Sequence, residues 1–100
     1  MLDPSRIQGF DWDNGNIDKN LEKHDITQQQ ADQVFLDPRL LVLDDEKHSG
    51  EEARFHAFGE TLDGRRLQIS FTLRLDRTLV RVISARPMSR KERIRYEEEA

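Results

Sequence analysis

The residues best suited to chemistry in this sequence are arginines at the ends or in the middle of strand-like segments. Arg54 and Arg66 each begin one such segment. Arg86 ends a third segment, and Arg81 interrupts the apolar run of that same segment. A guanidinium group binds phosphate through two parallel hydrogen bonds. A preorganised cation also stabilises the charge that develops on a phosphate during cleavage. These arginines therefore predict a site for a phosphate-containing ligand.

Arg81 is the most informative of the arginines, because its neighbours in the sequence are all apolar. By the two-residue period of a strand, it shares a face with Ile83 and Ala85. A charge on such a face costs several kcal/mol unless it is paired or lies at a cleft. Two interpretations follow: an ion pair with an acid such as Glu52 or Asp44, or an arginine directed at a bound phosphate.

A second set of candidates could transfer protons. His24 lies in the last turn of a predicted helix over 16–24, with Lys19 and Lys23 on its flank. In metal-free RNA cleavage a base removes the 2′-OH proton, cations stabilise the phosphorane, and an acid protonates the leaving 5′-oxygen. The alternative is structural, because the helix dipole favours a histidine at a helix C-terminus.

The composition excludes several other kinds of site. The sequence has no cysteine and its three histidines lack metal-ligand spacing, so we expect no metal and no cofactor. It also has no phosphate-cradling glycine loop and no nucleophile elbow. No apolar run approaches the roughly 20 residues that span a bilayer, and the N-terminus lacks a signal-peptide core. We therefore expect a cytoplasmic protein without a membrane partner.

Charge is distributed unevenly along the chain, although the net charge is −4. Residues 1–50 hold 11 acids and 5 bases, a net −6, whereas residues 51–100 hold 9 acids and 11 bases, a net +2. Within residues 64–96 there are ten bases, nine of them arginine, and two acids. This asymmetry indicates either phosphate recognition or a solvated surface that is basic for no functional reason.

The hydrophobic pattern predicts the elements that position these residues. Two helix starts carry capping boxes, one of Thr27 with Gln30 and the other of Ser89 with Glu92. The strongest strand is Arg66–Arg74, in which apolar and polar residues alternate without a break. The remaining predictions are a short opening strand near 7–12, helices over 16–24 and about 27–35, strands over 40–43, 54–59 and 79–85, and a helix from 89 onward.

The predicted order is β-α-α-β-β-β-β-α, which indicates the α+β class. Consecutive strands favour an antiparallel meander, with two N-terminal helices and a C-terminal helix gathered on one side or end. The strand over 40–43 is apolar on both faces, which is typical of a strand covered on both sides. One hundred residues suffice for one domain, so we expect a single domain over 1–100.

The predicted last helix has an unfavourable charge pattern. Basic residues occupy its first turns and Glu97, Glu98 and Glu99 its last, and both sets oppose the helix dipole. Its clear apolar residues are Ile94 and Tyr96. Three outcomes are open: a frayed tail, a helix ordered by a partner, or a helix whose basic end binds substrate.

Three blocks of sequence resemble the BrnT toxin family, in order and at the right separations. The first comprises Phe10-Asp11-Trp12-Asp13, Lys19–His24, Ala31–Phe35 and Asp37-Pro38; the second is Arg54–Gly59; the third comprises Arg81–Arg86, Ser89–Arg93 and Tyr96. The resemblance runs from end to end of the chain. It implies a compact fold similar to RelE-type ribonucleases.

The resemblance also implies an activity and a partner. It points to an endoribonuclease toxin that inhibits translation and is neutralised by a BrnA-like ribbon-helix-helix antitoxin, with DNA contacted only indirectly through that antitoxin. Trp12, Arg54, Arg81, Arg86, Lys23 and His24 are the family-matched positions. We expect catalytic roles for Arg54, Arg81, Arg86, His24 and Lys23, and substrate binding by Trp12, Lys19, Arg66, Arg93 and Tyr96.

The sequence departs from the family pattern at two positions. Asp25 stands where the family has a glycine helix cap, and Ala53 stands where it often has an acid, with Glu52 one place earlier. Glu52 would lie on the side of Arg54 if that strand extends back, as a base or an arginine anchor. Two alternatives to an enzyme therefore stay open: a non-catalytic module that binds a partner or nucleic acid, and a degenerate toxin retained for operon control.

Overall fold

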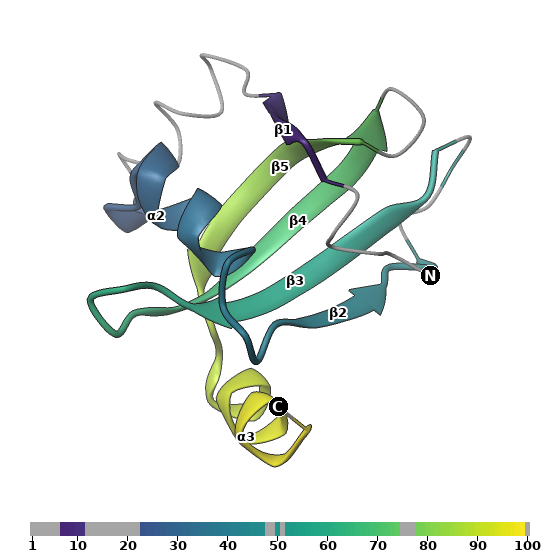
Figure 1. Cartoon of the computed structure of the whole chain (residues 1–100). Helices are drawn as coiled ribbons and strands as arrows, with labels where there is room; N and C mark the ends of the chain where they lie inside the picture. The colour runs from purple at the N-terminus through teal and green to yellow at the C-terminus, as the bar shows by residue number, and fades with distance from the viewer. Residues whose placement is uncertain (1–6, 12–22, 48–49, 51, 75–77, 100) are drawn as a thin grey trace.

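A computed structural model describes residues 7–11, 23–47, 50, 52–74 and 78–99 of the chain. Five strands form one sheet in the order β1-β5-β4-β3-β2, and two described helices pack against it (Figure 1). The α+β class is therefore confirmed. The elements are β1 (Gly9–Asp11), α2 (Gln28–Val34), β2 (Leu41–Asp44), β3 (Arg54–Glu60), β4 (Arg66–Arg74), β5 (Leu79–Pro87) and α3 (Arg90–Glu99).

The sheet is mixed, so the prediction of a purely antiparallel meander was wrong. Strands β2 to β5 do form the meander, but β1 pairs with β5 in parallel, with Gly9 opposite Leu79. No tight turn links β1 to another strand, because the chain passes through α2 to the opposite edge before β2 begins. A local pattern therefore could not set its partner. The predicted helix over 16–24 lies outside the described residues except for Lys23 and His24, which are helical.

Several predicted boundaries are confirmed to within two residues, and β4 matches its prediction at both ends. Both capping boxes are present. Thr27 Oγ1 accepts the Gln30 N–H at 3.1 Å, and Gln30 Oε1 accepts the Thr27 N–H at 3.0 Å. Ser89 and Glu92 make the same reciprocal bonds at 3.2 and 2.8 Å, which fixes the start of α3.

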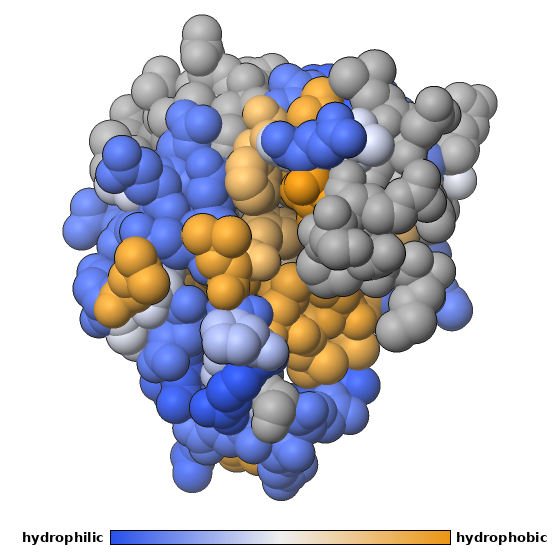
Figure 2. Space-filling model, viewed as in Figure 1, coloured by the Kyte–Doolittle hydropathy of each residue, from blue (hydrophilic) through white to orange (hydrophobic). Residues whose placement is uncertain are grey.

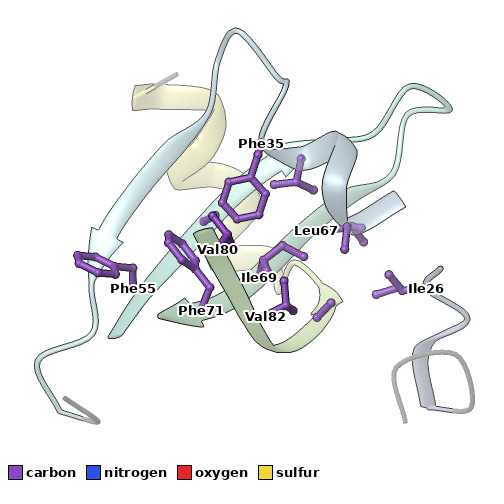
Figure 3. Packing of buried hydrophobic residues seen from close by; sticks show 12 residues of the cluster. Ile26, Phe35, Phe55, Leu67, Ile69, Phe71, Val80 and Val82 are labelled. Carbon is purple, nitrogen blue, oxygen red and sulfur yellow. The ribbon is translucent and has the colours of Figure 1, made fainter. Parts of the chain in front are cut away.

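The main core lies between α2 and the face of the sheet that carries Leu67, Ile69 and Phe71, all fully buried (Figure 3). Phe35, at the end of α2, packs edge-on against Phe71 with ring centroids 5.1 Å apart. The helix approaches β3 so closely that a Cβ on Gly59 would lie 2.8 Å from the carbonyl oxygen of Val34. Glycine at this position is therefore what lets α2 sit against the sheet.

Strand β2 differs from its prediction. Its apolar residues on both faces indicated a strand covered on both sides, but β2 is an edge strand whose Leu41, Val42 and Leu43 are each only half-buried. Figure 2 shows hydrophobic side chains exposed over β2, next to the mostly hydrophilic surface of α3. The pattern of residue types was correct for a strand, but it does not report how many neighbours a strand has.

A β-bulge in β5 changes which side chains share a face. Ser70 pairs with Ser84, whereas the next residue, Phe71, pairs with Val82, so Ile83 is an extra residue between two ladder positions. Beyond this extra residue, the alternation of side chains between the two faces of the sheet is shifted by one position. Arg81 consequently lies on the face opposite the buried Ala85, and the prediction that the two share a face was wrong.

Helix α3 is held by Tyr96, which is fully buried. Its hydroxyl donates a hydrogen bond to Asp37 Oδ2, and the backbone N–H groups of Arg39 and Glu60 each donate to the same carboxylate at 2.8 Å. The guanidinium groups of Arg39 and Arg66 lie 5.1 and 5.7 Å from the centre of the Tyr96 ring. Of the three outcomes left open by the sequence, these contacts exclude the frayed tail, because they hold α3 against the sheet.

The pKa values of Tyr96 and Asp37 are shifted in opposite directions. Burial raises the pKa of Tyr96 to about 12, and the hydrogen bond to Asp37 adds to that rise. Burial alone would raise the pKa of Asp37, but the hydrogen bonds from Tyr96 and from the backbone of Arg39 and Glu60 outweigh it and lower that pKa. The carboxylate is thus held in its charged form at the junction of α2, β3 and α3.

Removing the Tyr96 hydroxyl tests this anchor. We expect Tyr96→Phe to lower the free energy of unfolding by about 1.5–3 kcal/mol, as for a hydrogen bond to a charged group. Because the folded-state pKa of Asp37 is lowered, its contribution is present above the unfolded pKa and is lost as the pH falls through the folded pKa. Urea unfolding should therefore show a larger difference at neutral pH than near pH ~3. The half-exposed Ile94→Ala is the control and should show no such pH dependence.

Asp25 has a left-handed backbone conformation, with φ of 53°. Glycine adopts this conformation without strain, and it is the residue that the resemblance noted in the sequence leads us to expect at this helix end. The turn is therefore kept although the residue differs. Arg65 supports it from the β3–β4 hairpin, donating hydrogen bonds to the carbonyl oxygens of His24 at 3.0 Å and Asp25 at 2.5 Å.

Restoring glycine at position 25 should stabilise the protein. We expect Asp25→Gly to raise the free energy of unfolding by about 1 kcal/mol, because the left-handed conformation costs a residue with a Cβ about that much. Asp25→Ala keeps the Cβ and loses the tolerance of Asp for this conformation, so it should be less stable than the parent protein. Thermal unfolding checks both, and equal stability of the two variants would contradict the explanation.

Candidate functional site

Two predicted arginines lie in one row across the sheet, on the face opposite α2. In the strand register, Arg54 of β3 pairs with Thr72 of β4, and Thr72 pairs with Arg81 of β5. Adjacent strands lie about 4.8 Å apart, so the Cα atoms of the two arginines are separated by roughly 10 Å. That separation lets two long side chains converge on one small group between them.

The next rows of the same face carry polar side chains and a third arginine. His56 pairs with Ser70, which pairs with Ser84, and Gln68 pairs with Arg86 one row further along. Strand pairing therefore brings Arg54, Arg81 and Arg86 to one surface. We call this surface, with His56 at its centre, the arginine face.

His56 is the residue of this face that sequence analysis missed. Its Nε2 lies 3.1 Å from Asp45 Oδ2, and its Nδ1 lies 3.0 Å from Ser70 Oγ and also contacts the amide nitrogen of Gln68. Since a carboxylate only accepts hydrogen bonds, we assign the ring proton to Nε2, which leaves Nδ1 as the acceptor. The available signal was the period of β3, which places His56 on the face of Arg54.

The protonation of His56 depends on its surroundings. Burial lowers its pKa, Asp45 raises it, and the positive charges of Arg86 and Arg54 lower it again, with a net lowering from the ordinary value of 6.5. The ring is therefore neutral at neutral pH. A neutral imidazole with one acceptor nitrogen is suited to take up a proton.

The cations of the arginine face have acidic neighbours. Arg81 Nη1 lies 3.9 Å from Asp11 Oδ2, so the acid beside it is neither of the two candidates, Glu52 and Asp44. Glu52 instead pairs with Arg74 at 2.5 Å. The Arg81 side chain keeps 40% of its surface exposed, so it can also contact a ligand.

Arg86 is held more tightly than Arg81. Two of its nitrogens donate to the two carboxylate oxygens of Glu92 at 2.7 and 2.8 Å. This hydrogen bonding raises the pKa of Arg86 and lowers the pKa of Glu92. Because Glu92 also caps α3 through Ser89, the pair joins β5 to the first turn of that helix.

The other predicted catalytic residues lie elsewhere. Lys23 and His24 are near the β3–β4 hairpin, where Arg65 binds the His24 carbonyl. Six residues of β3 separate that end from Arg54, roughly 20 Å at 3.3 Å per residue. The structure does not bring the two residues to the arginine face, and their catalytic role stays a prediction.

The predicted substrate-binding residues have mixed positions. Arg66 pairs with Glu97 and Glu60 and lies over the Tyr96 ring, so it anchors α3. Tyr96 is fully buried and cannot contact a substrate while α3 keeps this position. Arg93 is exposed on α3, and Trp12 and Lys19 lie outside the described residues.

The part of the chain that the structure describes holds no group of three His, Cys, Asp or Glu side chains arranged to bind a metal ion. No helix among the described residues is long and apolar enough to cross a membrane.

Comparison with known proteins identifies the family. Residues 12–92 match the model of the family described as "Ribonuclease toxin, BrnT, of type II toxin-antitoxin system". The chain belongs to the BrnT family. The arginine face thus lies on the sheet face opposite α2 in a BrnT-family toxin, and the resemblance inferred from sequence is confirmed.

A solved structure supports the BrnT fold. The crystal structure of the Brucella abortus ribonuclease toxin BrnT is similar to this chain with a TM-score of 0.62 and 22% sequence identity. The similarity covers 82% of this chain and 97% of the Brucella chain. A search of curated proteins finds no match.

The coupling of His56 to Asp45 can be measured directly. Because Asp45 raises the pKa of His56, we expect Asp45→Asn to lower that pKa further. Titration of the imidazole carbon-bound protons by NMR gives the value in each variant. Asp63→Asn, in the β3–β4 hairpin, is the control and should leave the His56 titration unchanged. A higher pKa in Asp45→Asn would contradict the assigned contact.

Proposed function

We propose that this BrnT-family chain is a metal-independent endoribonuclease whose cleavage of RNA inhibits translation. The observation that carries the proposal is the row in which Arg54 and Arg81 flank Thr72, with His56 in the next row. The Cα atoms of the two arginines lie roughly 10 Å apart. Their guanidinium groups can therefore contact one phosphodiester from both sides. The match to a family of ribonuclease toxins agrees with a phosphodiester substrate.

The chemistry follows from these groups. The 2′-oxygen of the RNA attacks the adjacent phosphorus, a base takes its proton, and the bond to the 5′-oxygen breaks as that oxygen gains a proton. Arg54 and Arg81 stabilise the extra negative charge on the phosphorane. His56 is the candidate for one of the proton transfers, because its ring is neutral at neutral pH and is oriented by Asp45.

We further propose a BrnA-like ribbon-helix-helix antitoxin as the partner that neutralises the activity in the cytoplasm. Membership of a type II toxin–antitoxin family supports a protein antitoxin. The toxin itself would contact DNA only indirectly, through that antitoxin. The arginines of the arginine face are complementary to a partner that carries acidic side chains.

A specific observation favours a second candidate, a non-catalytic binding module or degenerate toxin. Both ring nitrogens of His56 already have partners, and Arg86 is bound bidentately by Glu92. Ala53 also leaves no acid immediately before Arg54. A module of this kind would bind RNA or its partner through the same arginines without cleaving RNA.

Substitution of the flanking arginines separates the two candidates. We expect Arg81→Ala and Arg54→Ala each to reduce RNA cleavage by roughly 10²–10³-fold, the usual cost of losing one group that stabilises transition-state charge. Arg90→Ala, at the exposed start of α3, is the matched control and should retain activity. Cleavage of a labelled RNA by the purified chain, with and without a chelator, measures both the loss and the metal independence.

Induction in a bacterial host gives the second test. Growth arrest with RNA loss, relieved by Arg81→Ala and by co-expression of the neighbouring gene, would support the ribonuclease toxin and its antitoxin. Normal growth and intact RNA from a folded, soluble chain would overturn the enzymatic proposal and leave the binding module.

A further inference from the structure

Thr72 lies on the arginine face with an arginine on three of its sides. Arg54 is its partner on β3 and Arg81 is its partner on β5. Arg74 follows two residues later on β4, so it projects from the same face. Cross-strand partners lie about 5 Å away and the second residue along a strand about 7 Å away, so all three side chains can reach over Thr72.

The hydroxyl group of Thr72 has an unusual environment. Thr72 keeps only 5% of its surface exposed. Within the part of the chain that the structure describes, its Oγ1 atom is buried and has no hydrogen-bond partner, and the same holds for the Nε atom of Arg74. Buried polar atoms are nearly always hydrogen-bonded, because an unpaired one has lost its water without replacement. Two donors are therefore buried at neighbouring positions of one face without an acceptor among the described residues.

The polar row beside Thr72 is different. Ser70, two residues earlier on β4, lies 3.0 Å from His56 Nδ1 and accepts a hydrogen bond from Gln68 Nε2 at 3.2 Å. Arg86 is bound by both carboxylate oxygens of Glu92. The unpartnered donors therefore lie where the arginines gather, and not where the face is simply polar. An acceptor that suits both a hydroxyl and several guanidinium groups is an anion with several oxygens.

We propose that the Thr72 hydroxyl is a ligand of the phosphate that the arginine face binds, and that it forms the floor of an oxyanion site together with Arg74. The identity of the anion, an RNA phosphodiester, rests on the proposed function. Arg54 and Arg81 would contact the phosphate from its two sides, and Thr72 would contact it from the sheet. A donor fixed in this way stabilises the charge that develops on the phosphorane oxygens.

The side chains around Thr72 leave an anion room to approach. Arg81 and Arg74 keep 40% and 38% of their side-chain surfaces exposed. The distance of 3.9 Å from Arg81 Nη1 to Asp11 Oδ2 is too long for a hydrogen bond, so Arg81 can turn toward a ligand without breaking one there. When the guanidinium groups turn outward to a phosphate, the hydroxyl beneath them gains its acceptor.

A hydroxyl kept for a ligand makes opposite predictions for stability and for binding. Thr72→Val removes the hydroxyl and keeps the branched shape, so the unliganded protein loses an unpaired buried group. We expect the melting temperature to rise by about 4 °C or more. We expect phosphate binding to weaken about tenfold, as for one hydrogen bond to a charged group. Thr72→Ser keeps a hydroxyl and should retain most of the affinity.

Inorganic phosphate is the probe, because its binding needs no cleavage step. NMR titration of the ¹⁵N-labelled chain at constant ionic strength gives the phosphate affinity of each variant. Phosphate should shift the amide signals of Thr72 and Arg81 and the Nε–H signal of Arg74. Chloride at the same ionic strength should leave these signals in place. Thermal unfolding in phosphate-free buffer gives the melting temperatures.

Thr61→Val is the matched control, because Thr61 is equally buried, at 4% exposed, but has a fully used hydroxyl. Its Oγ1 accepts the Arg65 N–H at 2.9 Å and donates to Asp63. Thr61 follows the last residue of β3, at the hairpin end of the sheet and away from Arg54. We therefore expect Thr61→Val to lower the melting temperature and to leave phosphate binding at Thr72 unchanged.

The outcomes are distinct from those of the RNA cleavage assay. Absence of phosphate binding, equal affinity in the parent chain and Thr72→Val, or a melting temperature lowered as in Thr61→Val would each overturn the inference. A chain that cleaves RNA equally well with Thr72→Val, and binds phosphate equally well, contradicts this inference alone. A chain that binds phosphate through Thr72 and leaves RNA intact contradicts the proposed ribonuclease and keeps the site.

Discussion

The carboxylate of Asp37 is the contact on which the arrangement of the molecule depends. It lies just after α2 and binds the backbone of β3 at Glu60 and the hydroxyl of Tyr96 in α3. Three elements that are far apart in the chain are therefore fixed to one charged group. Because α3 also carries Glu92, the same contact sets where Arg86 is held. The charge on this partly buried carboxylate is stabilised by the hydrogen bonds that it accepts.

Much of the fold could be predicted from local patterns. The alternation along Arg66–Arg74 and the capping boxes at Thr27 and Ser89 depend on residues close in sequence, and all were confirmed. The partner of β1 and the edge position of β2 depend on contacts between distant segments. The bulge at Ile83 depends on how β5 pairs with β4, so no reading of β5 alone reveals it.

The residues of the candidate site, like the elements of the fold, could be predicted from the sequence only in part. Residue type and position identified Arg54, Arg81 and Arg86, because arginine suits phosphate binding and the three stand at the ends or in the middle of strand-like segments. The role of His56 could not be seen, since its partners Asp45 and Ser70 come from two other segments and meet it only through strand pairing. The reverse error concerns Tyr96, whose residue type suits substrate binding but whose burial makes it an anchor.

The parallel pairing of β1 with β5 also closes a long loop at one end of the arginine face. The pairing joins residues 9–11 to residues 79–81, a separation of about 70 residues that must close into a loop before Asp11 meets Arg81. Such long-range closure is slow compared with hairpin formation between β3, β4 and β5, whose connections are only a few residues long in the sequence. The meander can thus assemble first, with Arg54 beside Thr72, while the Asp11 end of the row is still open. The first strand in the sequence is thus the one whose pairing closes the longest loop in this sheet.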